Sequence, residues 1–369
     1  MDTTGVVDYE TATVAELPSS VSIQVTEACN LHCKMCYEWG EKGRYRQPGT
    51  QKKSASLDIG MLKQVIKTLA PARPSYDLFG GEPLVYPHLE ELIVAIKEAG
   101  SALDTPTNGT LLKKHAPMLV NTGFDSVRVS LDGPKEINDA QRGPGSYDRA
   151  MAGIEALHRE KRKTGSRTPI ISIIFTVTSA NYLSIEQFFL HELNLDAIDW
   201  ITIQMQNFVT EPMGKAYARM LESEFGITSD LYWSGLIQDT VDFQNIDTAQ
   251  IARQVDKVRN ALQVAGKNIL LLPPTFSSAN LSAYLKAQWG KMTDSYRHCP
   301  IPWNVADITA AGDVAPCHVF YDLVMGNLYE QDFAEIWNGN KYKNFRNYMR
   351  RHGLMPICPG CCILYLAGH

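Results

Sequence analysis

Three cysteines near the amino end of the chain have a spacing that suits an iron–sulfur cluster. Cys29, Cys33 and Cys36 follow a short strand-like run, residues 21–26, in the order C-x3-C-x2-C. Three thiolates on one tight loop can hold three corners of a four-iron, four-sulfur cluster. Such clusters usually take four cysteines, so one iron would stay open to another ligand. The alternatives for these thiols are a zinc site, completed by His32 or a distant cysteine, and disulfide bonds.

The other five of the eight cysteines lie after residue 298. Residues 307–309 and 314–317 flank a glycine-containing turn and predict a β-hairpin. Cysteines at either end of such a hairpin, joined by a later C-x2-C, can bring four thiolates to one point. A structural zinc ion also takes four ligands and is the alternative here. The five cysteines are Cys299, Cys317, Cys358, Cys361 and Cys362.

The composition is that of an ordinary soluble globular protein. It has 369 residues, 44% hydrophobic and 20% charged, enough for a large core and two or three structural units. The net charge of −5 argues against a nucleic-acid partner held through its phosphates. No apolar run approaches a membrane span, and residues 1–17 lack the pattern of a signal peptide. We therefore expect a cytoplasmic protein with no membrane partner, whose cysteines are metal ligands or reactive thiols.

Strand-like and helix-like segments alternate along most of the chain, and this alternation predicts an α/β fold with a parallel sheet. The predicted strands are residues 21–26, 76–79, 102–105, 126–131, 170–177 and 200–204. The predicted helices are residues 57–69, 89–99, 111–121, 147–161, 184–193 and 248–265. Six such units make an open, partial (β/α)6 barrel, in which the chemistry lies on loops at the carboxyl ends of the strands. Residues 268–272 predict an extra strand and residues 281–289 a short helix.

Polar and glycine-rich segments follow these strands at the positions where a barrel carries its chemistry. Adjacent glycines let the backbone approach a ligand closely, and a guanidinium can bind a carboxylate in a bidentate fork. Asn-Gly and Asp-Gly are also common turns, so each segment alone is a weak signal. The residues concerned are Gly80, Gly81, Glu82, Thr107, Asn108, Ser130, Asp132 and Arg142.

The cysteine loop and these segments together resemble the radical S-adenosylmethionine (radical SAM) superfamily. Met35-Cys36-Tyr37 fits the end of its C-x3-C-x-Φ-C motif, where Φ is apolar or aromatic, and the later segments fit its GGE, TNG, S-L-D-G and R-G-x-G-S-[FY] motifs. The resemblance implies that Cys29, Cys33 and Cys36 hold a 4Fe-4S cluster whose open iron binds SAM. It implies further SAM contacts from Tyr37, Gly80, Gly81, Glu82, Thr107, Asn108, Ser130, Asp132 and Arg142.

The carboxyl-terminal part resembles the twitch/SPASM extension of radical SAM enzymes. Cys299 is followed by G-x4-C, G-N-L, I-W-N and C-x2-C segments, and the chain then ends without the further cysteines of a second auxiliary cluster. The resemblance implies one auxiliary 4Fe-4S cluster, held by Cys299, Cys317, Cys358 and Cys361. Cys362 is left over, although adjacent cysteines can exchange roles. The predicted domains are a tail (1–20), the barrel (21–265), a bridging segment (266–298) and the auxiliary-cluster domain (299–369).

The resemblance implies that a 5′-deoxyadenosyl radical, made by reductive cleavage of SAM, abstracts hydrogen from an unactivated carbon. Return of hydrogen from a thiol, with Cys362 as the candidate, would give an epimer, whereas loss of a further electron and proton would give a dehydrogenated product. The short tail favours a small-molecule substrate, such as a carbohydrate, over a ribosomal peptide to be epimerised or cross-linked. A non-catalytic iron–sulfur or zinc scaffold is the third hypothesis. The electron donor would be a flavodoxin or ferredoxin.

Overall fold

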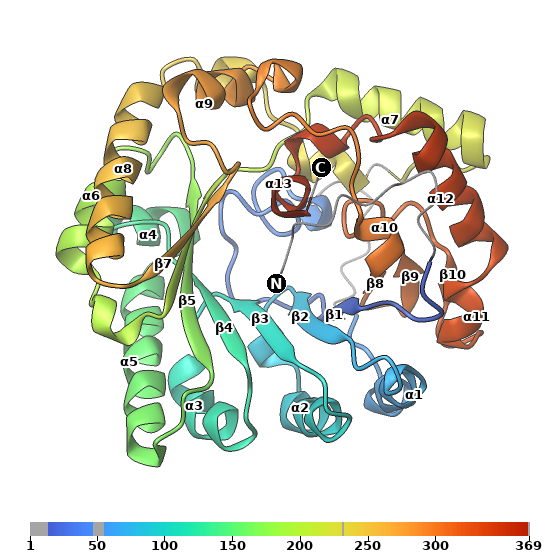
Figure 1. Cartoon of the computed structure of the whole chain (residues 1–369), viewed down its shortest axis with the longest axis horizontal. Coiled ribbons are helices and arrows are strands. Elements are labelled where there is room, and N and C mark those ends of the chain that lie inside the picture. Colours follow the sequence, from blue (N-terminus) through green and yellow to red (C-terminus); the bar gives the residue numbers. More distant parts are fainter. Residues whose placement is uncertain (1–13, 47–54, 231, 368–369) are drawn as a thin grey trace.

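The computed structural model describes residues 14–46, 55–230 and 232–367, so most of the predicted tail lies outside the described residues. A single ten-stranded sheet runs through them in the order β10-β9-β8-β1-β2-β3-β4-β5-β6-β7 (Figure 1). The strands are β1 (Ser20–Thr26), β2 (Ser75–Gly80), β3 (Leu103–Thr107), β4 (Ser126–Ser130), β5 (Ile170–Val177), β6 (Trp200–Met205), β7 (Asn268–Leu272), β8 (Val305–Ile308), β9 (Asp313–Ala315) and β10 (Gly326–Asn327). Strands β1 to β7 are parallel to their neighbours.

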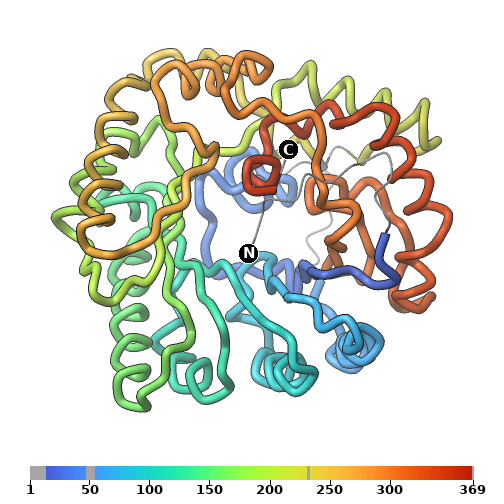
Figure 2. The backbone as a smooth tube through the Cα atoms, viewed as in Figure 1, coloured from blue at the N-terminus to red at the C-terminus, as the bar shows by residue number. Residues whose placement is uncertain are grey.

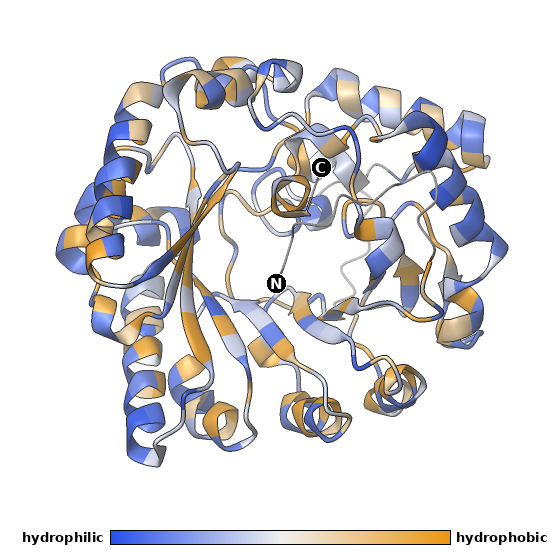
Figure 3. Ribbon diagram, in the orientation of Figure 1, coloured by the Kyte–Doolittle hydropathy of each residue, from blue (hydrophilic) through white to orange (hydrophobic). Residues whose placement is uncertain are grey.

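Helices pack against the outside of this curved sheet, with their apolar stripes toward the strands (Figure 3). In α1 the stripe is Leu62, Val65, Ile66 and Leu69, and the Asp58 side chain caps the first turn. The first six helices are α1 (Ile59–Leu69), α2 (Leu89–Glu98), α3 (Leu112–Asn121), α4 (Lys135–Arg142), α5 (Ser146–Thr164) and α6 (Ile185–Gln187, continued by a π-turn). They are followed by α7 (Glu211–Phe225), α8 (Thr248–Val264), α9 (Ser278–Leu285), α10 (Ile301–Asn304), α11 (Phe333–Trp337), α12 (Asn340–His352) and α13 (Cys362–Ala367). No helix among the described residues is long and apolar enough to cross a membrane.

The predicted α/β class with an open sheet is confirmed, and each predicted strand and helix corresponds to an element of the structure. The short helix expected at residues 281–289 is displaced, because α9 begins at Ser278 and ends at Leu285. No predicted range corresponds to α4, α7, α10, α11, α12 or α13. The extra strand is β7, which pairs parallel with β6 as a seventh strand of the barrel.

The carboxyl-terminal hairpin continues the barrel sheet, which the sequence did not indicate. Strand β8 pairs parallel with β1, so that Ser20 lies opposite Val305 and Ile23 opposite Ile308. Strands β9 and β10 then add to β8 as antiparallel neighbours. In Figure 2 the carboxyl-terminal part of the tube accordingly lies beside the amino-terminal strand. The two groups of cysteines therefore belong to one continuous framework.

Three charged residues point into the barrel from β2, β3 and β4. Asp77, Asp104 and Arg128 alternate with the buried Leu78 and Val127, whose side chains face the helices. A terminal guanidinium nitrogen of Arg128 lies 2.6 Å from Asp77 Oδ1 and 2.8 Å from Asp104 Oδ1. The barrel interior is therefore polar at this level.

Candidate active site

Cys29, Cys33 and Cys36 lie on the loop that leaves the carboxyl end of β1. Backbone N–H groups of this loop donate hydrogen bonds to two of the sulfurs. Leu31 N donates to Cys29 Sγ at 3.4 Å, and Trp39 N donates to Cys36 Sγ at 3.3 Å. Burial raises the pKa of Cys29 to about 12 and that of Cys36 to about 11. A buried thiol becomes a thiolate readily only when positive charge lies beside it, and iron ligation supplies such charge.

The two predicted glycines allow the end of β2 to touch the start of the cysteine loop. Gly80 has φ +136°, and a Cβ there would lie 2.3 Å from Thr26 O. A Cβ on Gly81 would lie 2.2 Å from Ala28 O. The backbone nitrogens of Gly81 and Glu82 donate to Thr26 O and Ala28 O, both at 2.9 Å. Only glycine permits this close backbone contact, and the contact itself does not depend on a ligand.

Glu82 holds the loop after β3 in place. Its buried carboxylate accepts hydrogen bonds from the Thr107 hydroxyl at 2.6 Å and from Asn108 N at 2.8 Å. The Asn108 side chain donates to Asn30 Oδ1 at 2.8 Å, and Asn30 donates to Thr110 Oγ1 at 2.9 Å. The structure thus brings Glu82, Thr107 and Asn108 together and ties them to the residue next to Cys29. Burial raises the pKa of Glu82.

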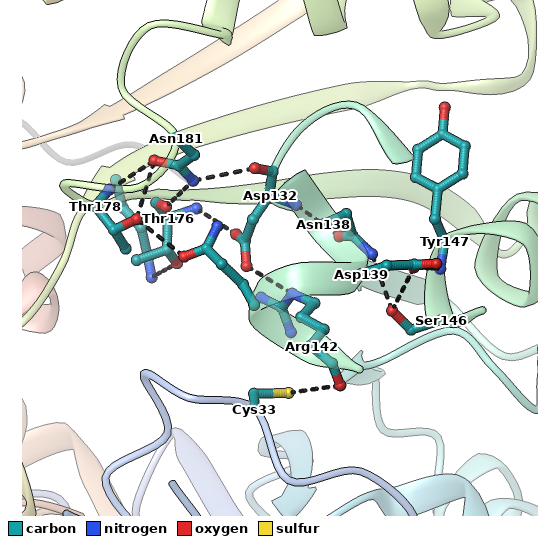
Figure 4. A network of polar contacts seen from close by, with 12 residues as sticks. Cys33, Asp132, Asn138, Asp139, Arg142, Ser146, Tyr147, Thr176, Thr178 and Asn181 are labelled. Atoms are coloured by element: carbon teal, nitrogen blue, oxygen red, sulfur yellow. Dashed lines mark hydrogen bonds and ion pairs between the residues drawn. The ribbon is translucent and has the colours of Figure 1, made fainter. Parts of the chain in front are cut away.

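Asp132 and Arg142 form a buried ion pair next to the cysteine loop (Figure 4). Arg142 Nε donates to Asp132 Oδ2 at 2.6 Å, and Thr176 N donates to Asp132 Oδ1 at 3.0 Å. Cys33 Sγ lies 4.0 Å from the backbone oxygen of Arg142. The pair therefore places a guanidinium beside one of the three thiols.

A cavity of about 430 Å³ opens beside Cys36 and the carboxyl end of α4. Its walls come from the cysteine loop, from α4 and from the segments after β5 and β6, and most of the lining side chains are polar. The lining residues include Met35, Cys36, Glu41, Lys42, Glu136, Gln141, Thr178, Ser179, Gln206 and Gln238. Met35, the Φ position of the cysteine motif, lines this cavity, whereas Tyr37 lines a separate one. Ser130 lies at the end of β4, on its barrel side.

The second group of cysteines lines a cavity of its own. Cys299, Cys317, Cys358 and Cys361 surround it, with apolar walls from residues such as Pro302, Phe320, Met349 and Leu364. Burial raises the pKa of Cys299 to about 11 and also raises that of Cys358. The structure thus brings together the four thiols that the sequence assigned to the auxiliary cluster.

Cys362 is not among the residues that line this cavity. Its backbone nitrogen donates to Asn207 Oδ1 at 3.0 Å, and the Asn207 amide donates to Cys362 Sγ at 3.2 Å. Because Asn207 follows β6, these hydrogen bonds hold the Cys362 thiol close to the end of a barrel strand. A hydrogen bond with Cys361 lowers the pKa of the Cys362 thiol, and the charge of His318 acts in the same direction. Sequence reasoning missed Asn207, for which no motif gave a signal.

A small cavity lies between the two cysteine groups. It is lined by Tyr37, Asn207, His318 and Cys361, among others, and has a volume of about 50 Å³. Tyr37 directly follows Cys36, and Cys361 belongs to the auxiliary cavity, so this space adjoins both groups. His318 Nδ1 lies 3.6 Å from the buried Asp307.

The geometry of the thiols suits clusters better than single ions. Among the described residues, no three His, Cys, Asp or Glu side chains converge closely enough to hold one metal ion. Zinc would need its sulfur ligands at about 2.3 Å. A four-iron cluster spreads its thiolates over separate irons, which matches cysteines that share a cavity without meeting at one point. The donor sets therefore fit two clusters.

Comparisons with known proteins agree with this arrangement. The model of the radical SAM superfamily matches residues 23–182, and that of an iron–sulfur cluster-binding domain, SPASM, matches residues 299–362. A pre-heme d1 synthase of Dinoroseobacter shibae is 26% identical over 85% of this chain and 72% of its own length. The mycofactocin maturase MftC of Mycobacterium tuberculosis is 32% identical over 38% of this chain and 35% of the maturase.

Solved structures show the same fold. The crystal structure of Streptococcus suis SuiB bound to S-adenosylmethionine superposes with a TM-score of 0.62 at 17% identity, over 94% of this chain and 74% of SuiB. The two family models lie on the two cysteine groups and together match more than half of the chain. The chain therefore belongs to the radical SAM superfamily, carries a SPASM domain at its carboxyl end, and uses S-adenosylmethionine and two 4Fe-4S clusters as cofactors.

Proposed function

We propose that this enzyme inverts a carbon centre of a polar small molecule, with a carbohydrate as the first candidate and Cys362 as the hydrogen donor. Cys29, Cys33 and Cys36 hold the SAM-binding cluster, and Cys299, Cys317, Cys358 and Cys361 hold the auxiliary cluster. A reduced cluster held by these thiols would supply the electron that splits SAM into methionine and a 5′-deoxyadenosyl radical, and this radical would take a hydrogen atom from the substrate. The protein aligns the target carbon and excludes other donors.

The residues around the first loop have suitable chemistry for SAM. Arg142, bound to Asp132 through its Nε, places a guanidinium, a group that suits a carboxylate, beside the cysteine loop. Gly80, Gly81 and Glu82 present backbone at the loop, with Thr107 and Asn108 fixed behind them, and Ser130 and Tyr37 complete the set that the resemblance assigns. The polar walls beside Cys36 favour a substrate with many hydroxyl or amino groups.

Cys361 and Cys362 are hydrogen-bonded to each other but differ in their other neighbours, and this difference carries the proposal of epimerisation. Cys361 lines the auxiliary cavity with three other cysteines, whereas Cys362 is bound to Asn207 at the end of β6. The substrate radical takes a hydrogen atom from Cys362 S–H on its opposite face, which forms the new C–H bond and leaves a thiyl radical. This transfer is downhill because an S–H bond is weaker than a C–H bond. One electron and one proton from an external donor restore the thiol.

Turnover in D2O with a panel of aminoglycosides and other sugar alcohols tests this function. The wild type should release 5′-deoxyadenosine and an epimer that carries one solvent deuterium at the inverted carbon. Cys362→Ala should still release 5′-deoxyadenosine and keep its iron, but it should form no labelled epimer. Unchanged epimer formation by Cys362→Ala would rule out the thiol donor. A protein that releases no 5′-deoxyadenosine with any reductant would be a scaffold.

Dehydrogenation or cross-linking of a peptide is a second candidate, and one observation favours it. The mycofactocin maturase matches 38% of this chain at 32% identity. A product two hydrogens lighter than its substrate, formed without Cys362, would support this reaction. For either reaction we propose a cytoplasmic location, because none of the eight cysteines is in a disulfide bond. We also propose a flavodoxin or ferredoxin as the electron donor.

A further inference from the structure

The carboxyl-terminal segment has a charge opposite to that of the whole chain. The protein has a net charge of −5, yet no aspartate or glutamate occurs after Glu335. Helix α12 alone carries Lys341, Lys343, Arg346, Arg350, Arg351 and His352. Arg346 is buried, whereas Lys341, Lys343, Arg351 and His352 are exposed. Figure 3 shows this helix as predominantly hydrophilic.

A second segment brings further positive charge to the end of α12. A surface cavity of about 370 Å³ is lined by residues from both segments, and no acidic residue contributes to its walls. We call these residues the basic face: Tyr296, Arg297, His298, Arg350, Arg351, His352, Gly353 and Leu354. Gly353, with φ +75°, permits the contact, because a Cβ there would lie 2.8 Å from Arg297 O. Neither Arg297 nor Arg351 has an ion-pair partner within the part of the chain that the structure describes.

The basic face adjoins the auxiliary cavity along two segments of the chain. His298 precedes Cys299, and Arg350 follows Met349; Cys299 and Met349 both line that cavity. Basic residues in the last turn of a helix also complement its dipole, which accounts for charge at the end of α12. The dipole does not account for Arg297 and His298, which come from another segment, or for the lack of acidic residues. A partner that contacts His298 on this face would therefore lie next to Cys299, a ligand of the auxiliary cluster.

We propose that the basic face docks an acidic electron-transfer protein of the flavodoxin or ferredoxin class. The reduced donor gives up one electron and is oxidised. With one proton from solvent, that electron restores the thiol consumed in each epimerisation, so this inference rests on the proposed function. Charge complementarity supports this occupant, because such proteins are acidic and because positive patches accelerate and orient association with acidic partners. The overall negative charge of the chain argues against nucleic acid as the occupant.

The test compares charge reversals on two surfaces of the holoenzyme. Arg297→Glu combined with Arg351→Glu should weaken binding of a flavodoxin at low salt by at least about tenfold and flatten the salt dependence of its Kd. Arg162→Glu combined with Arg167→Glu is the matched control, because both arginines are exposed near the carboxyl end of α5. This control variant should bind flavodoxin as tightly as the wild type.

Chemical reduction separates docking from chemistry. With dithionite, both double variants should release as much 5′-deoxyadenosine as the wild type, because this small reductant needs no docking face. Flavodoxin binding that the basic-face variant leaves unchanged would overturn the proposal, and so would preferential binding of duplex DNA by this face. Absence of 5′-deoxyadenosine with dithionite in every form would instead contradict the proposed function, whatever the binding result.

Discussion

Arg142 Nε lies 2.6 Å from Asp132 Oδ2, and the side chains are only 12% and 0% exposed. Burial alone would lower the pKa of Arg142, but the Asp132 carboxylate and the nearby Cys33 sulfur raise it above its usual value. The guanidinium therefore stays charged beside the cysteine loop. The same charge lowers the pKa of the Cys33 thiol, against the larger effect of burial. The charge of Arg142 thus favours the thiolate form of Cys33, which is the form that binds iron.

Asp132→Asn should destabilise the protein strongly, because Arg142 would remain buried without its carboxylate. Breaking a buried ion pair from one side costs about 3–5 kcal/mol. Urea unfolding of the anaerobic protein measures this loss. The control is Lys135→Met, which breaks the exposed pair with Asp148 and should leave the unfolding midpoint unchanged. Equal unfolding midpoints for the two variants would contradict the role of this pair.

Gly81→Ala should reduce iron at the first cysteine loop. The new Cβ would lie 2.2 Å from Ala28 O, so the loop that begins at Cys29 must move. Iron analysis and the cluster absorbance should fall by about half, because the auxiliary cysteines lie on other segments of the chain. Gly290→Ala is the matched control, since nothing lies within 4 Å of the corresponding Cβ. Full iron content in Gly81→Ala would show that the contact is not required.

The sequence predicted those parts of the fold and site that depend on local patterns. Buried β-branched residues in β5 and the apolar stripe of α8 identify a strand and a helix within a few residues of their observed ends. The spacing of the first three cysteines and the adjacent glycines are properties of one loop and of the strand next to it. Such features need no knowledge of distant contacts.

The remaining features depend on contacts between distant segments. The pairing of β8 with β1 joins residues about 285 positions apart, which no local pattern encodes. Asn207 and Cys362 meet across 155 positions, and the basic face combines residues on either side of residue 299. Helix α4 has a mostly polar sequence and buries the polar Asn138 and Gln141, so no stripe of apolar residues marks it in the sequence.

The charged group inside the barrel predicts a pH effect on stability. Burial raises the pKa of Asp104 to about 8, against the attraction of Arg128 and with help from the Asp77 carboxylate. The folded state therefore keeps a proton that the unfolded state releases near pH 4. Stability from this group is complete below about pH 4, falls as pH rises, and is lost above about pH 8.

Asp104→Asn should remove this part of the pH dependence. The difference in unfolding free energy between the wild type and Asp104→Asn should decrease steadily from about pH 6 to about pH 8. Urea unfolding at several pH values measures it. Asp148→Asn, at an exposed position, should give a difference that does not change over the same range. A difference for Asp104→Asn that is constant or rises with pH would contradict the raised pKa.

Asn207 should act as a positioning residue for the Cys362 thiol. Its amide donates to Sγ at 3.2 Å and its Oδ1 accepts from the Cys362 backbone at 3.0 Å, so Asn207→Leu removes both contacts and keeps the branched shape of the side chain. We expect normal iron content and normal release of 5′-deoxyadenosine. The ratio of solvent-labelled epimer to 5′-deoxyadenosine should fall about tenfold, equivalent to about 1.4 kcal/mol in the hydrogen-return step.

Two further variants separate positioning from simple structural damage. Asn207→Gln keeps the amide and should restore part of the product ratio, which a purely structural role would not require. Asn268→Leu replaces an exposed asparagine at the start of β7 and should leave the ratio unchanged. An unchanged ratio in Asn207→Leu would mean that Cys362 needs no orientation, and loss of iron in that variant would place Asn207 in support of the auxiliary cluster instead. Because the ratio compares two products of the same turnover, a general loss of active enzyme cannot imitate the expected result.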